Sequence, residues 1–592
     1  MKKLLTVVLL MSLMVLYGCQ EKDNIINDSV PGVIEDIVVE DIINDEINFN
    51  ENRYIDYTDE SYITLDGSST NYTITTSGTY ELTGQIDETV IVDISEDEDI
   101  RLILNQVTIT PSINSAILIL SADDVEISVV EGSTNTLVDS TNYADLYQDY
   151  NATIYSNADL GINGLGTLNV VSNYNDAIQT KDDLMLVDLS LNITSKDDAI
   201  IGRDSISIDA VNLTIDALGD GLKTTNDENE MKGFTYIKSG TFDITALGDG
   251  IDSKNSIIIE DGTLTFDTEN ESIKSDQNIY IANGDYTIES LDDGIDSDQN
   301  IIINGGRFNI NSDKDALHSN QSITLSNLSL VIHATDDAIH SDDVLTILSG
   351  TITITSSYEG LEGKSIFISG GTINIVATDD GINASDPEVE VVEGGIPNLQ
   401  TDPTESTAII NISGGNLIIE AEDDGIDANG TFIMTGGTVV INGPVNGMQS
   451  AVDYDLKWIQ EGGILIAVAG YGHETKVPSS ESTQTTIVYN LEQTNHANQT
   501  FSLIDDQSVL YAFTPKKEYE VILISSPDLN LNSTYSISFN GEITGDLING
   551  YYTLANVEND TIFATFNLDE IINTFNLEAT SVTPFPGGNR PR

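Results

Sequence analysis

The sequence is poor in cysteine, tryptophan, basic residues and long apolar segments. Its 592 residues include one Cys and one Trp, and 22 Lys and Arg stand against 97 Asp and Glu, for a formal net charge of −75. A single cysteine excludes a disulfide framework and any cysteine-based zinc site. The negative charge argues against nucleic acid and anionic lipid surfaces as direct partners, because both are polyanions. It favours cations instead, above all Ca²⁺, which binds carboxylate and carbonyl oxygens.

The one marked apolar run lies at the N-terminus. It covers residues 4–16 after Lys2 and Lys3, is too short for a comfortable membrane span and fits the core of a signal peptide. Its end, Leu16-Tyr17-Gly18-Cys19, resembles a bacterial lipobox with Cys19 as the lipid acceptor. We therefore expect residues 1–19 to be a lipoprotein signal peptide and the protein to be lipid-anchored at the extracellular face of the bacterial cell membrane. A plain secretion signal is the alternative.

Hydrophobic residues make up 39% of the chain, enough for a core, and they follow a repeat. An acidic–Gly/Ala–aliphatic motif recurs mostly every 22 residues; the spacing is 29 across a polar insertion near residues 225–232 and 44 across an acidic loop at about residues 385–406. The next copy after the last acidic one is Asn446-Gly447-Met448. The acidic position falls at Asp176, Asp198, Asp220, Asp249, Glu271, Asp293, Asp315, Asp337, Glu359, Asp380 and Asp424.

Each period contains three short candidate strands. After Asp293-Gly294-Ile295, for example, the chain reads Ile301-Ile302-Ile303, then Gly305-Gly306, then Phe308-Asn309-Ile310. Strands of period two separated by Gly, Asn, Asp and Ser predict an all-β fold. Three strands in 22 residues suit one coil of a parallel β-helix, which the general crossover preference makes right-handed. Coils stack at about 4.8 Å, so Ile295 and Leu317 should be vertical neighbours in the interior.

The period also defines the predicted domains. Residues 20–60 are an acidic linker, 61–150 irregular β coils or an N-terminal cap, and 151–450 the β-helix repeats. Residues 451–575, which include Trp458, are a C-terminal β cap, and 576–592 a disordered tail. Caps are expected because the terminal coils of a solenoid expose strand edges. We expect a monomer.

Stacked carboxylates are the main chemical feature of the repeat. Like charges one coil apart repel by ~1 kcal/mol per pair in water and by several kcal/mol at an effective dielectric of about 20. That destabilises the rod unless cations intervene or the pKa values rise. Ca²⁺ accepts about six to eight oxygens in flexible geometry, so neighbouring coils could supply a site. We predict Ca²⁺ as the cofactor, with the candidate ligands Asp249, Asp252, Asp292, Asp293, Asp296, Asp315, Asp336, Asp337, Asp379, Asp380, Asp423, Asp424 and Asp427.

The acidic column also has a purely structural interpretation. Asp-Gly and Asp-Ala form turns, and Asp side chains hydrogen-bond backbone amides at corners. His318 and His340 follow the motif in two neighbouring copies. They could hold a transition metal together or be solvent-facing residues of the ladder.

The repeats resemble those of a known family. Residues 249–253 and 293–297 read Asp-Gly-Ile-Asp-Ser, and residues 424–428 read Asp-Gly-Ile-Asp-Ala. Further matching segments are Gly78-Thr79-Tyr80, Ala122-Asp123-Asp124-Val125, Phe513-Thr514-Pro515-Lys516 and Ile524-Ser525-Ser526-Pro527. Over about residues 62–545 they are similar to bacterial surface carbohydrate-binding β-helix proteins, whose fold is like that of pectate lyases. The resemblance implies binding of polygalacturonate or cellulose, and bound calcium, but no particular carbohydrate-binding residues.

Three functions are compatible with these features. The preferred one is a polysaccharide-binding protein, for an acidic polysaccharide such as polygalacturonate, because Ca²⁺ bridges would overcome the repulsion between two anions. For a neutral glucan Tyr280, Tyr286 or Tyr358 would have to supply an aromatic platform. A calcium-rigidified structural or adhesive surface protein is one alternative.

A pectate-lyase-like enzyme is the other alternative. A pectate lyase needs a basic side chain near Ca²⁺ to take the C5 proton of the substrate. A polygalacturonase, which would be a hydrolase on the same fold, is not indicated, because its Gly-His-Gly and Arg-Ile-Lys motifs are missing. The regular ladder counts against catalysis, because a catalytic site should break the repeat at one place. We therefore assign no catalytic residue. The candidate bases for a lyase are Lys223, Lys254, Lys274, Arg203, Arg307 and Lys314.

Overall fold

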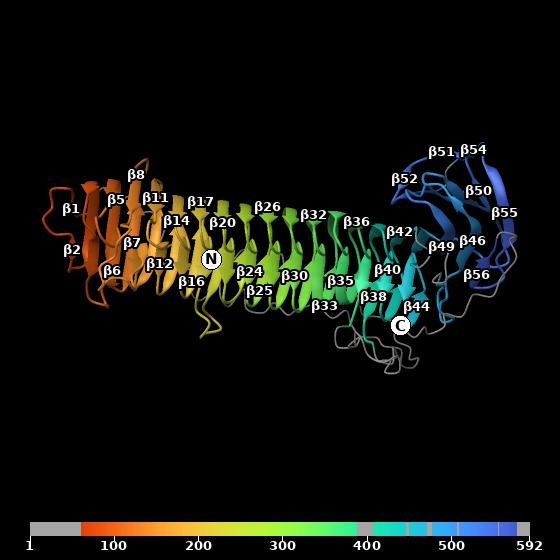
Figure 1. Ribbon diagram of the computed structural model, residues 1–592, viewed down its shortest axis with the longest axis horizontal. Helices are drawn as coiled ribbons and strands as arrows, with labels where there is room; N and C mark the ends of the chain where they lie inside the picture. The colour runs from red at the N-terminus through yellow and green to blue at the C-terminus, as the bar shows by residue number, and fades with distance from the viewer. Residues whose placement is uncertain are drawn as a thin grey trace, which may run out of the picture.

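The computed structural model describes residues 61–386, 406–445, 449–470, 476–505, 508–553 and 556–576. Every secondary-structure element assigned in these residues is a β-strand. They form a long rod of stacked coils with a further group of strands at its C-terminal end (Figure 1). The predicted all-β parallel β-helix is confirmed. Cys19, the predicted linker and the predicted tail after residue 576 lie outside the described residues.

Each regular coil consists of three strands. The coil after Asp293 contains β27 (Ile295–Ser297), β28 (Asn300–Ile303) and β29 (Arg307–Ser312). These pair in parallel with the next coil's strands β30 (Leu317–Ser319), β31 (Ser322–Leu325) and β32 (Leu328–Ala334). Ile295 pairs with Leu317, so residues 22 apart are indeed vertical neighbours. We call the three sides of the rod the β27 face, the β28 face and the β29 face.

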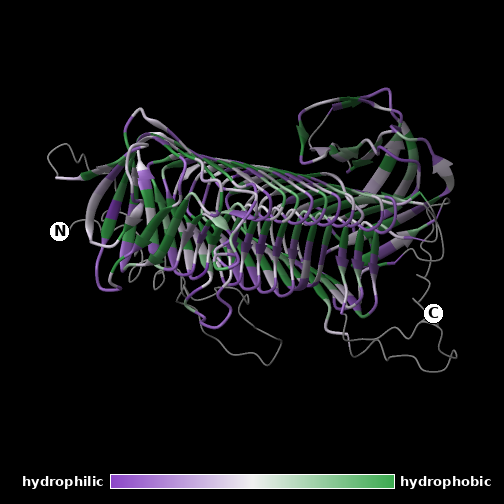
Figure 2. Cartoon of the chain, turned by 60° about the vertical axis from the view of Figure 1, so that its left-hand side comes forward, coloured by the Kyte–Doolittle hydropathy of each residue, from purple (hydrophilic) through white to green (hydrophobic). Residues whose placement is uncertain are grey.

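Alternation of apolar and polar residues fills the interior. In β29 Phe308 and Ile310 point inward and are buried, while Arg307, Asn309 and Asn311 are exposed. The same alternation of hydrophobic and hydrophilic residues is visible along the stacked strands in Figure 2. Each fully buried Ile or Phe contributes roughly 1.5–3 kcal/mol of transfer free energy, so every coil supplies its own share of the core.

Glycine and serine complete the corners of the coil. Gly306, between β28 and β29, has φ of 96°, and a Cβ there would come within 2.9 Å of the Gly284 carbonyl oxygen one coil below. A left-handed backbone with so close a neighbour requires glycine. At the end of β27 the buried Ser297 donates through Oγ to the Gln277 carbonyl oxygen at 2.6 Å, which satisfies a polar group inside the rod.

The stack begins near the start of the described residues. β1 (Ile63–Leu65) pairs in parallel with β3 (Gly78–Ile86), and β3 pairs with β5 (Ile100–Ile109). β5 then pairs with β7 (Asp124–Val129), which pairs with β10 (Asp159–Gly164). The less regular sequence of residues 61–150 therefore continues the same parallel stack.

The stack also extends beyond the predicted end of the repeats. β43 (Val452–Tyr454), β44 (Lys457–Gln460) and β45 (Ile464–Ala469) pair in parallel with the preceding coil, and Ile426 pairs with Val452. Val452 rather than Met448 thus continues the aliphatic column, because this coil is longer than the period; Asn446, Gly447 and Met448 lie outside the described residues. The predicted boundary at residue 450 comes one coil too early, and Trp458 lies fully buried inside this last coil.

An antiparallel group of strands follows the last coil. β49 (Tyr519–Ser525) pairs antiparallel with β45 and with β46 (Thr486–Asn495), so β45 is not left as an open edge. A separate six-stranded sheet includes β47 (Phe501–Ile504) and β48 (Val509–Phe513). Its core contains Tyr489 and Phe566 together with Val440 and Ile466 from the coils. We find no helix with the length and apolarity of a membrane span among the described residues.

Candidate functional site

Two stacked columns of polar residues run along the corner that opens the β27 face. The acidic column consists of the eleven motif carboxylates named above, from Asp176 to Asp424. The second column lies three residues further on, in the middle of the short strands, and successive members pair directly across the strands. We call the two columns together the seam. The second column consists of Lys223, Asp252, Lys274, Asp296, His318, His340, Glu362, Asn383, Asp427 and Asp453.

One oxygen of the acidic column is used structurally. The Asp337 backbone N–H donates to Asp315 Oδ1 at 2.8 Å, and the Glu359 N–H donates to Asp337 Oδ1 at 2.9 Å. The Asp424 N–H likewise donates to Asp380 Oδ1 at 2.7 Å. These bonds satisfy corner amides that are buried with the column. The structural interpretation of the acidic column therefore holds for one carboxylate oxygen, and the second oxygen is left to meet a cation.

Two lysines of the second column meet that second oxygen. Lys223 Nζ donates to Asp220 Oδ2 at 2.5 Å and lies 3.3 Å from Asp198 Oδ2. Lys274 Nζ donates to Glu271 Oε1 at 2.6 Å. Burial, the largest single influence, would raise the pKa of Glu271, but the hydrogen bonds of its carboxylate with Lys274, Asp249 and the backbone and the charge of Lys274 together lower it. The pKa of both lysines is raised by their carboxylate partners despite burial.

The C-terminal coils of the seam have no lysine in the second column. Asp380 and Asp424 form no ion pair with a basic side chain in the described part of the chain. Burial, followed by the charge of Asp427, raises the pKa of Asp380 to about 8. Burial and the charges of Asp427, Asp453 and Asp380 raise the pKa of Asp424 to about 9. This stretch is a buried concentration of negative charge that only protons or an added cation can relieve.

A second group of carboxylates lies between the two lysines. Asp220, Asp249 and Asp252 are all buried, and one oxygen of each lies within 4.8 Å of the others. Asp249 Oδ1 and Asp252 Oδ1 are buried without a hydrogen-bond partner among the described residues. The ammonium group of Lys254 lies 3.9 Å from Asp252 Oδ1, which is too far for a hydrogen bond. Burial and the neighbouring Glu271 raise the pKa of Asp249 to about 8.

The middle of the seam combines carboxylates with imidazoles. Asp296 Oδ1 lies 2.7 Å from His318 Nδ1, and Asp315 Oδ2 lies 3.2 Å from His340 Nδ1. One atom each of Asp293, Asp296 and His318 lie within 4.8 Å of one another, as do atoms of Asp337, His340 and Glu362. The predicted ligands of these coils are therefore brought together with histidine rather than with carboxylates alone.

The four predicted ligands that precede the acidic column are placed beside the seam. Asp292 and Asp336 are more exposed than the column residues, and Lys314 Nζ lies 2.5 Å from Asp292 Oδ1. Asp379 and Asp423 are half-buried and stacked, since the Asp423 N–H donates to the Asp379 carbonyl oxygen at 3.1 Å. They extend the negative surface around Asp380 and Asp424 rather than the interior of the seam.

All six candidate bases for lyase chemistry are held by carboxylates. Lys254 lies 3.1 Å from Asp276, Lys314 pairs with Asp292, and Arg307 lies 2.7 Å from Asp285. Arg203 lies 3.3 Å from both Asp204 and Glu228, and Lys223 and Lys274 are described above. A base must lose its proton before it can accept one, and these partners oppose that loss.

The three candidate tyrosines do not form a platform. Tyr286 is buried in the interior and stacks on Phe308 at 4.4 Å between ring centroids. Tyr280 packs on the β28 face beside Tyr236 and Ile258, and Tyr358 is exposed at a corner. No common surface joins them.

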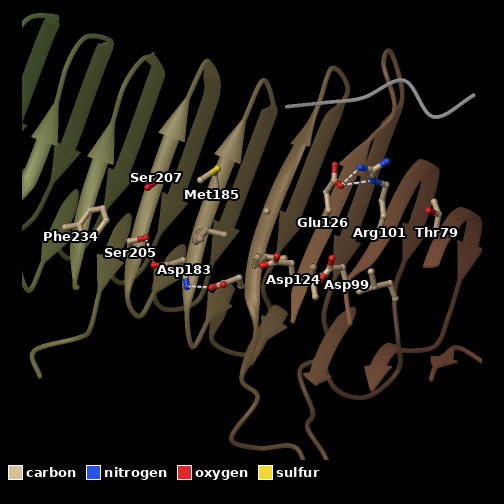
Figure 3. A pocket seen from close by; sticks show the side chains of 16 residues that line it. Thr79, Asp99, Arg101, Asp124, Glu126, Asp183, Met185, Ser205, Ser207 and Phe234 are labelled. Atoms are coloured by element: carbon tan, nitrogen blue, oxygen red, sulfur yellow. Dashed lines mark hydrogen bonds and ion pairs between the residues drawn. The ribbon is translucent and has the colours of Figure 1, made fainter. Parts of the chain in front are cut away.

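A groove of about 580 Å³ lies on the β28 face of the first coils. It crosses β5, β7, β10, β13 (Asp183–Val187), β16 (Ser205–Asp209) and β19 (Phe234–Ile237), and thus follows the long axis of the rod (Figure 3). A row of carboxylates and serine lines one edge, and Met185 and Phe234 lie toward the C-terminal end. The row consists of Asp99, Asp124, Asp159, Asp183 and Ser205.

The groove residues are joined by hydrogen bonds. Arg101 donates through Nε to Glu126 Oε2 at 2.6 Å, and Glu126 Oε1 accepts from Asn163 Nδ2 at 2.7 Å. Asp183 donates its N–H to Asp159 Oδ1 at 3.0 Å and accepts from Ser205 Oγ at 2.6 Å. Burial first, then neighbouring carboxylates, raise the pKa of Asp159 to about 6. The edge is an ordered row of acceptors at the one-per-coil spacing of ~4.8 Å.

Sequence reasoning missed this groove and part of the seam. Glu359 and Glu362 were not chosen as ligands, although they occupy both columns of one coil. The predicted ligands were all aspartates, and counting the glutamates of the two columns as ligands would have found both. The groove carboxylates Asp124, Asp159 and Asp183 stack in space but are 35 and 24 residues apart. No period in the sequence could have revealed them.

Comparisons with known proteins agree with the carbohydrate-binding resemblance. The chain matches the family model described as "Carbohydrate-binding domain-containing protein" over residues 68–327 and 314–488. A carbohydrate-binding domain-containing protein of Acetivibrio thermocellus is 32% identical over 205 residues, which cover 34% of this chain and 72% of that protein. A solved structure, the polysaccharide lyase-like protein from C. thermocellum as a gadolinium derivative, is 31% identical with a TM-score of 0.36 and covers 37% of this chain and 96% of that chain.

Proposed function

The chain belongs to the family of carbohydrate-binding domain-containing proteins, and from this premise we propose that it binds an acidic polysaccharide through calcium ions held in its seam. Carbohydrate is the ligand class of the family. The observation that carries the finer proposal is the acidic stretch at Asp380 and Asp424, whose buried carboxyl groups have raised pKa values and no basic partner among the described residues. An anionic chain could approach it only with cations between the two.

The donor set at these coils suits Ca²⁺. Asp380 and Asp424 each use one oxygen for a corner amide, of Asp424 and Ser450 respectively, and have one oxygen left for a cation. Two charges 4 Å apart repel by about 4 kcal/mol at an effective dielectric of 20, which a divalent ion would reverse. Ca²⁺ needs about six to eight oxygens, more than the seam supplies, so carboxylates of the polysaccharide and water would complete its shell.

The test is binding to polygalacturonate with and without calcium. We expect retention of the full chain on polygalacturonate in Ca²⁺ and a loss of roughly tenfold or more in affinity in EDTA. The double variant Asp380→Asn with Asp424→Asn keeps the oxygens that accept from the corner amides. It should lose most of the calcium-dependent gain in affinity for polygalacturonate. Asp267→Asn, an exposed change on the β29 face, is the matched control. Equal binding in Ca²⁺ and EDTA would contradict the proposal.

The groove supports a second candidate contact, with a neutral polysaccharide and without calcium. Its acceptor row repeats once per coil, and carboxylate oxygens accept hydrogen bonds from sugar hydroxyls at these ~4.8 Å intervals. Unlike the seam, the row is already ordered by its own hydrogen bonds. Retention on a neutral glucan in EDTA would identify this contact, and retention on polygalacturonate only in Ca²⁺ would identify the seam.

The ion pairs of the seam favour binding over lyase chemistry. The two lysines nearest to the buried carboxylates, Lys223 and Lys274, are fixed as protonated partners. Release of unsaturated uronides from pectate, followed by ultraviolet absorbance, would instead support the lyase alternative. A calcium-rigidified adhesive protein would show calcium-dependent melting without any glycan retention.

We also propose that the protein is a monomeric lipoprotein of the outer cell surface, acylated at Cys19. The lipobox-like residues Leu16 to Cys19 support this location, where a polysaccharide would be accessible. Metabolic labelling with a clickable fatty acid should mark the wild-type protein and leave Cys19→Ala unlabelled. Labelling of the variant to the same extent would rule out the anchor.

A further inference from the structure

The middle of the seam differs from the rest because it contains nitrogen donors. His318 and His340 lie in neighbouring coils and meet edge to face, with ring centroids 5.1 Å apart. The His318 ring is engaged by Asp296 at hydrogen-bond distance. His340 is half-buried and has carboxylates beside both of its ring nitrogens.

The two ring nitrogens of His340 have different partners. Nδ1 lies 3.2 Å from Asp315 Oδ2, a hydrogen bond that fixes the orientation of the ring, and 3.8 Å from Asp337 Oδ2. Nε2 lies 3.5 Å from Glu362 Oε2 and 3.5 Å from Asp342 Oδ1, which is too far for a good hydrogen bond. Zinc bonds of about 2.1 Å at a tetrahedral angle place two ligand atoms roughly 3.4 Å apart. The spacing around Nε2 thus matches a ligand set better than a hydrogen bond.

A buried carboxylate oxygen beside this set has no partner. Glu359 is 8% exposed, and its Oε2 forms no hydrogen bond among the described residues. Its other oxygen accepts from Asn383 Nδ2 at 3.0 Å. Of the neighbouring charges, those of Glu362 and Asp337 raise the pKa of Glu359 most. A buried carboxyl oxygen without a donor, beside the carboxyl groups of Glu362 and Asp337, is one that a bound cation would satisfy.

We propose that Asp337, His340 and Glu362 bind a divalent transition-metal ion of the Zn²⁺ class, with Glu359 as a further carboxylate beside it. One ligand atom of each of the three lies within 4.8 Å of the others. Imidazole is a donor for Zn²⁺, Cu²⁺, Ni²⁺ or Co²⁺, whereas Ca²⁺ takes oxygen ligands only. Asp315 is a positioning residue, because a carboxylate on the far nitrogen orients a metal-bound histidine.

This site is independent of the calcium sites proposed above. It takes a different class of metal, and its ligands come from the coils that contain Asp337 and Glu359. The ion would connect these two coils across the seam, at the boundary between the coils with basic residues in the second column and those without. Calcium-dependent glycan retention can therefore be absent while the transition metal binds, and the transition metal can fail to bind while calcium-dependent retention is observed.

The test is titration of the full chain, without a histidine tag and in excess Ca²⁺, with Co²⁺ and then Zn²⁺. We expect one Co²⁺ per chain with the visible absorption of a low-coordinate nitrogen–oxygen site, displaced by Zn²⁺. His340→Ala should weaken binding roughly 100-fold and Asp315→Asn roughly tenfold. His333→Ala, an exposed histidine on the β29 face, is the matched control and should bind like the wild type.

Other results would overturn the assignment. They are an unchanged Co²⁺ spectrum in His340→Ala, a loss in His318→Ala but not in His340→Ala, or displacement of Co²⁺ by millimolar Ca²⁺. Far-ultraviolet circular dichroism and calcium-dependent retention on polygalacturonate show whether each variant is folded. If His340→Ala does not fold, Glu362→Gln decides, since it removes one ligand charge from a half-buried position.

Discussion

Two glutamates in the same column behave in opposite ways. Glu271 and Glu359 both open a coil, and both are held at the corner of the rod. Three residues later the first coil has Lys274 and the second has Glu362. The pKa of Glu271 is lowered, because the bonds with Lys274, Asp249 and the backbone and the charge of Lys274 together outweigh burial, whereas burial and the charge of Glu362 raise the pKa of Glu359 to about 9.

The difference shows that the second column sets the chemistry of the first. The corner is built alike in both regions, since a backbone amide of the next coil bonds Asp220 and Asp337 in the first region and Asp380 in the second. From Lys223 to His340 the second column contains four basic residues and two acids, and from Glu362 to Asp427 it contains no base. In the first region the protein's own bases pair with part of the acidic column, as Lys223 does with Asp220 and Lys274 with Glu271. The second requires protons or metal ions, and this contrast can be tested by four measurements.

The largest expected effect is that of pH on the metal-free protein. The pKa values of Asp380 and Asp424 rise from 3.8 in the unfolded chain to about 8 and about 9 in the fold. The folded state therefore retains protons that the unfolded state has lost, and stability falls as pH rises through this window. The slope is roughly 1.4 kcal/mol per pH unit for each retained proton. Chemical unfolding in EDTA between pH 5 and pH 9 measures it.

Calcium and a variant provide the controls for this pH dependence. Saturating Ca²⁺ should flatten the slope, because it binds the deprotonated carboxylates of the fold. The double variant Asp380→Asn with Asp424→Asn should flatten it without calcium. A metal-free protein that becomes more stable between pH 6 and pH 9 would show that these carboxylates are not buried as acids.

Some features of the stacked coils could be predicted from the sequence, and others could not. The stacking of Ile295 on Leu317 followed from the period alone, because a repeat of 22 must place equivalent residues one above the other. The register of Val452 did not, since the coil there is longer than the period and Met448 imitates the motif. The structural role of one oxygen in each carboxylate was expected only as a local turn, and it proved to reach the next coil.

The candidate site was less predictable than the fold. Which acid is neutralised depends on an ammonium that is 2.6 Å away, as between Lys274 and Glu271, and such distances are set by side-chain packing rather than by the repeat. The lysines appeared in the sequence as candidate bases for catalysis. In the structure they are the counter-ions of the acidic column.

The second effect concerns a lysine added to the region that lacks one. Asn383→Lys reproduces, next to Asp380, the spacing of Lys223 from Asp220. Its ammonium should occupy the calcium position, stabilise the metal-free protein and lower calcium-dependent affinity for polygalacturonate roughly 100-fold, or about 2.7 kcal/mol. Asn309→Lys, which adds the same charge on the exposed β29 face, is the control. Retention of calcium-dependent binding by Asn383→Lys would place the calcium elsewhere.

The third effect is the reverse change. Lys274→Met leaves Glu271 and Asp249 without a cation and should destabilise the metal-free protein by about 2 kcal/mol, less than for a fully buried pair. The lysine keeps 34% of its side-chain surface exposed, which moderates the effect. Added Ca²⁺ should restore most of the loss, because the coil then resembles the C-terminal region. Lys314→Met, which breaks a mostly exposed pair, should change stability by less than about 1 kcal/mol.

The smallest effect concerns the groove, where the acceptors are ordered without any added cation. Replacement of both Asp159 and Asp183 by Asn keeps one carbonyl oxygen in each but removes the charge that strengthens hydrogen bonds from sugar hydroxyls. We expect affinity for a neutral glucan in EDTA to fall roughly threefold to tenfold, and calcium-dependent retention on polygalacturonate to stay unchanged. Affinity electrophoresis with both polymers measures the two together. If the groove variant instead lost the calcium-dependent retention, the acidic polymer would have to lie along the β28 face, and the contrast within the seam would concern stability alone.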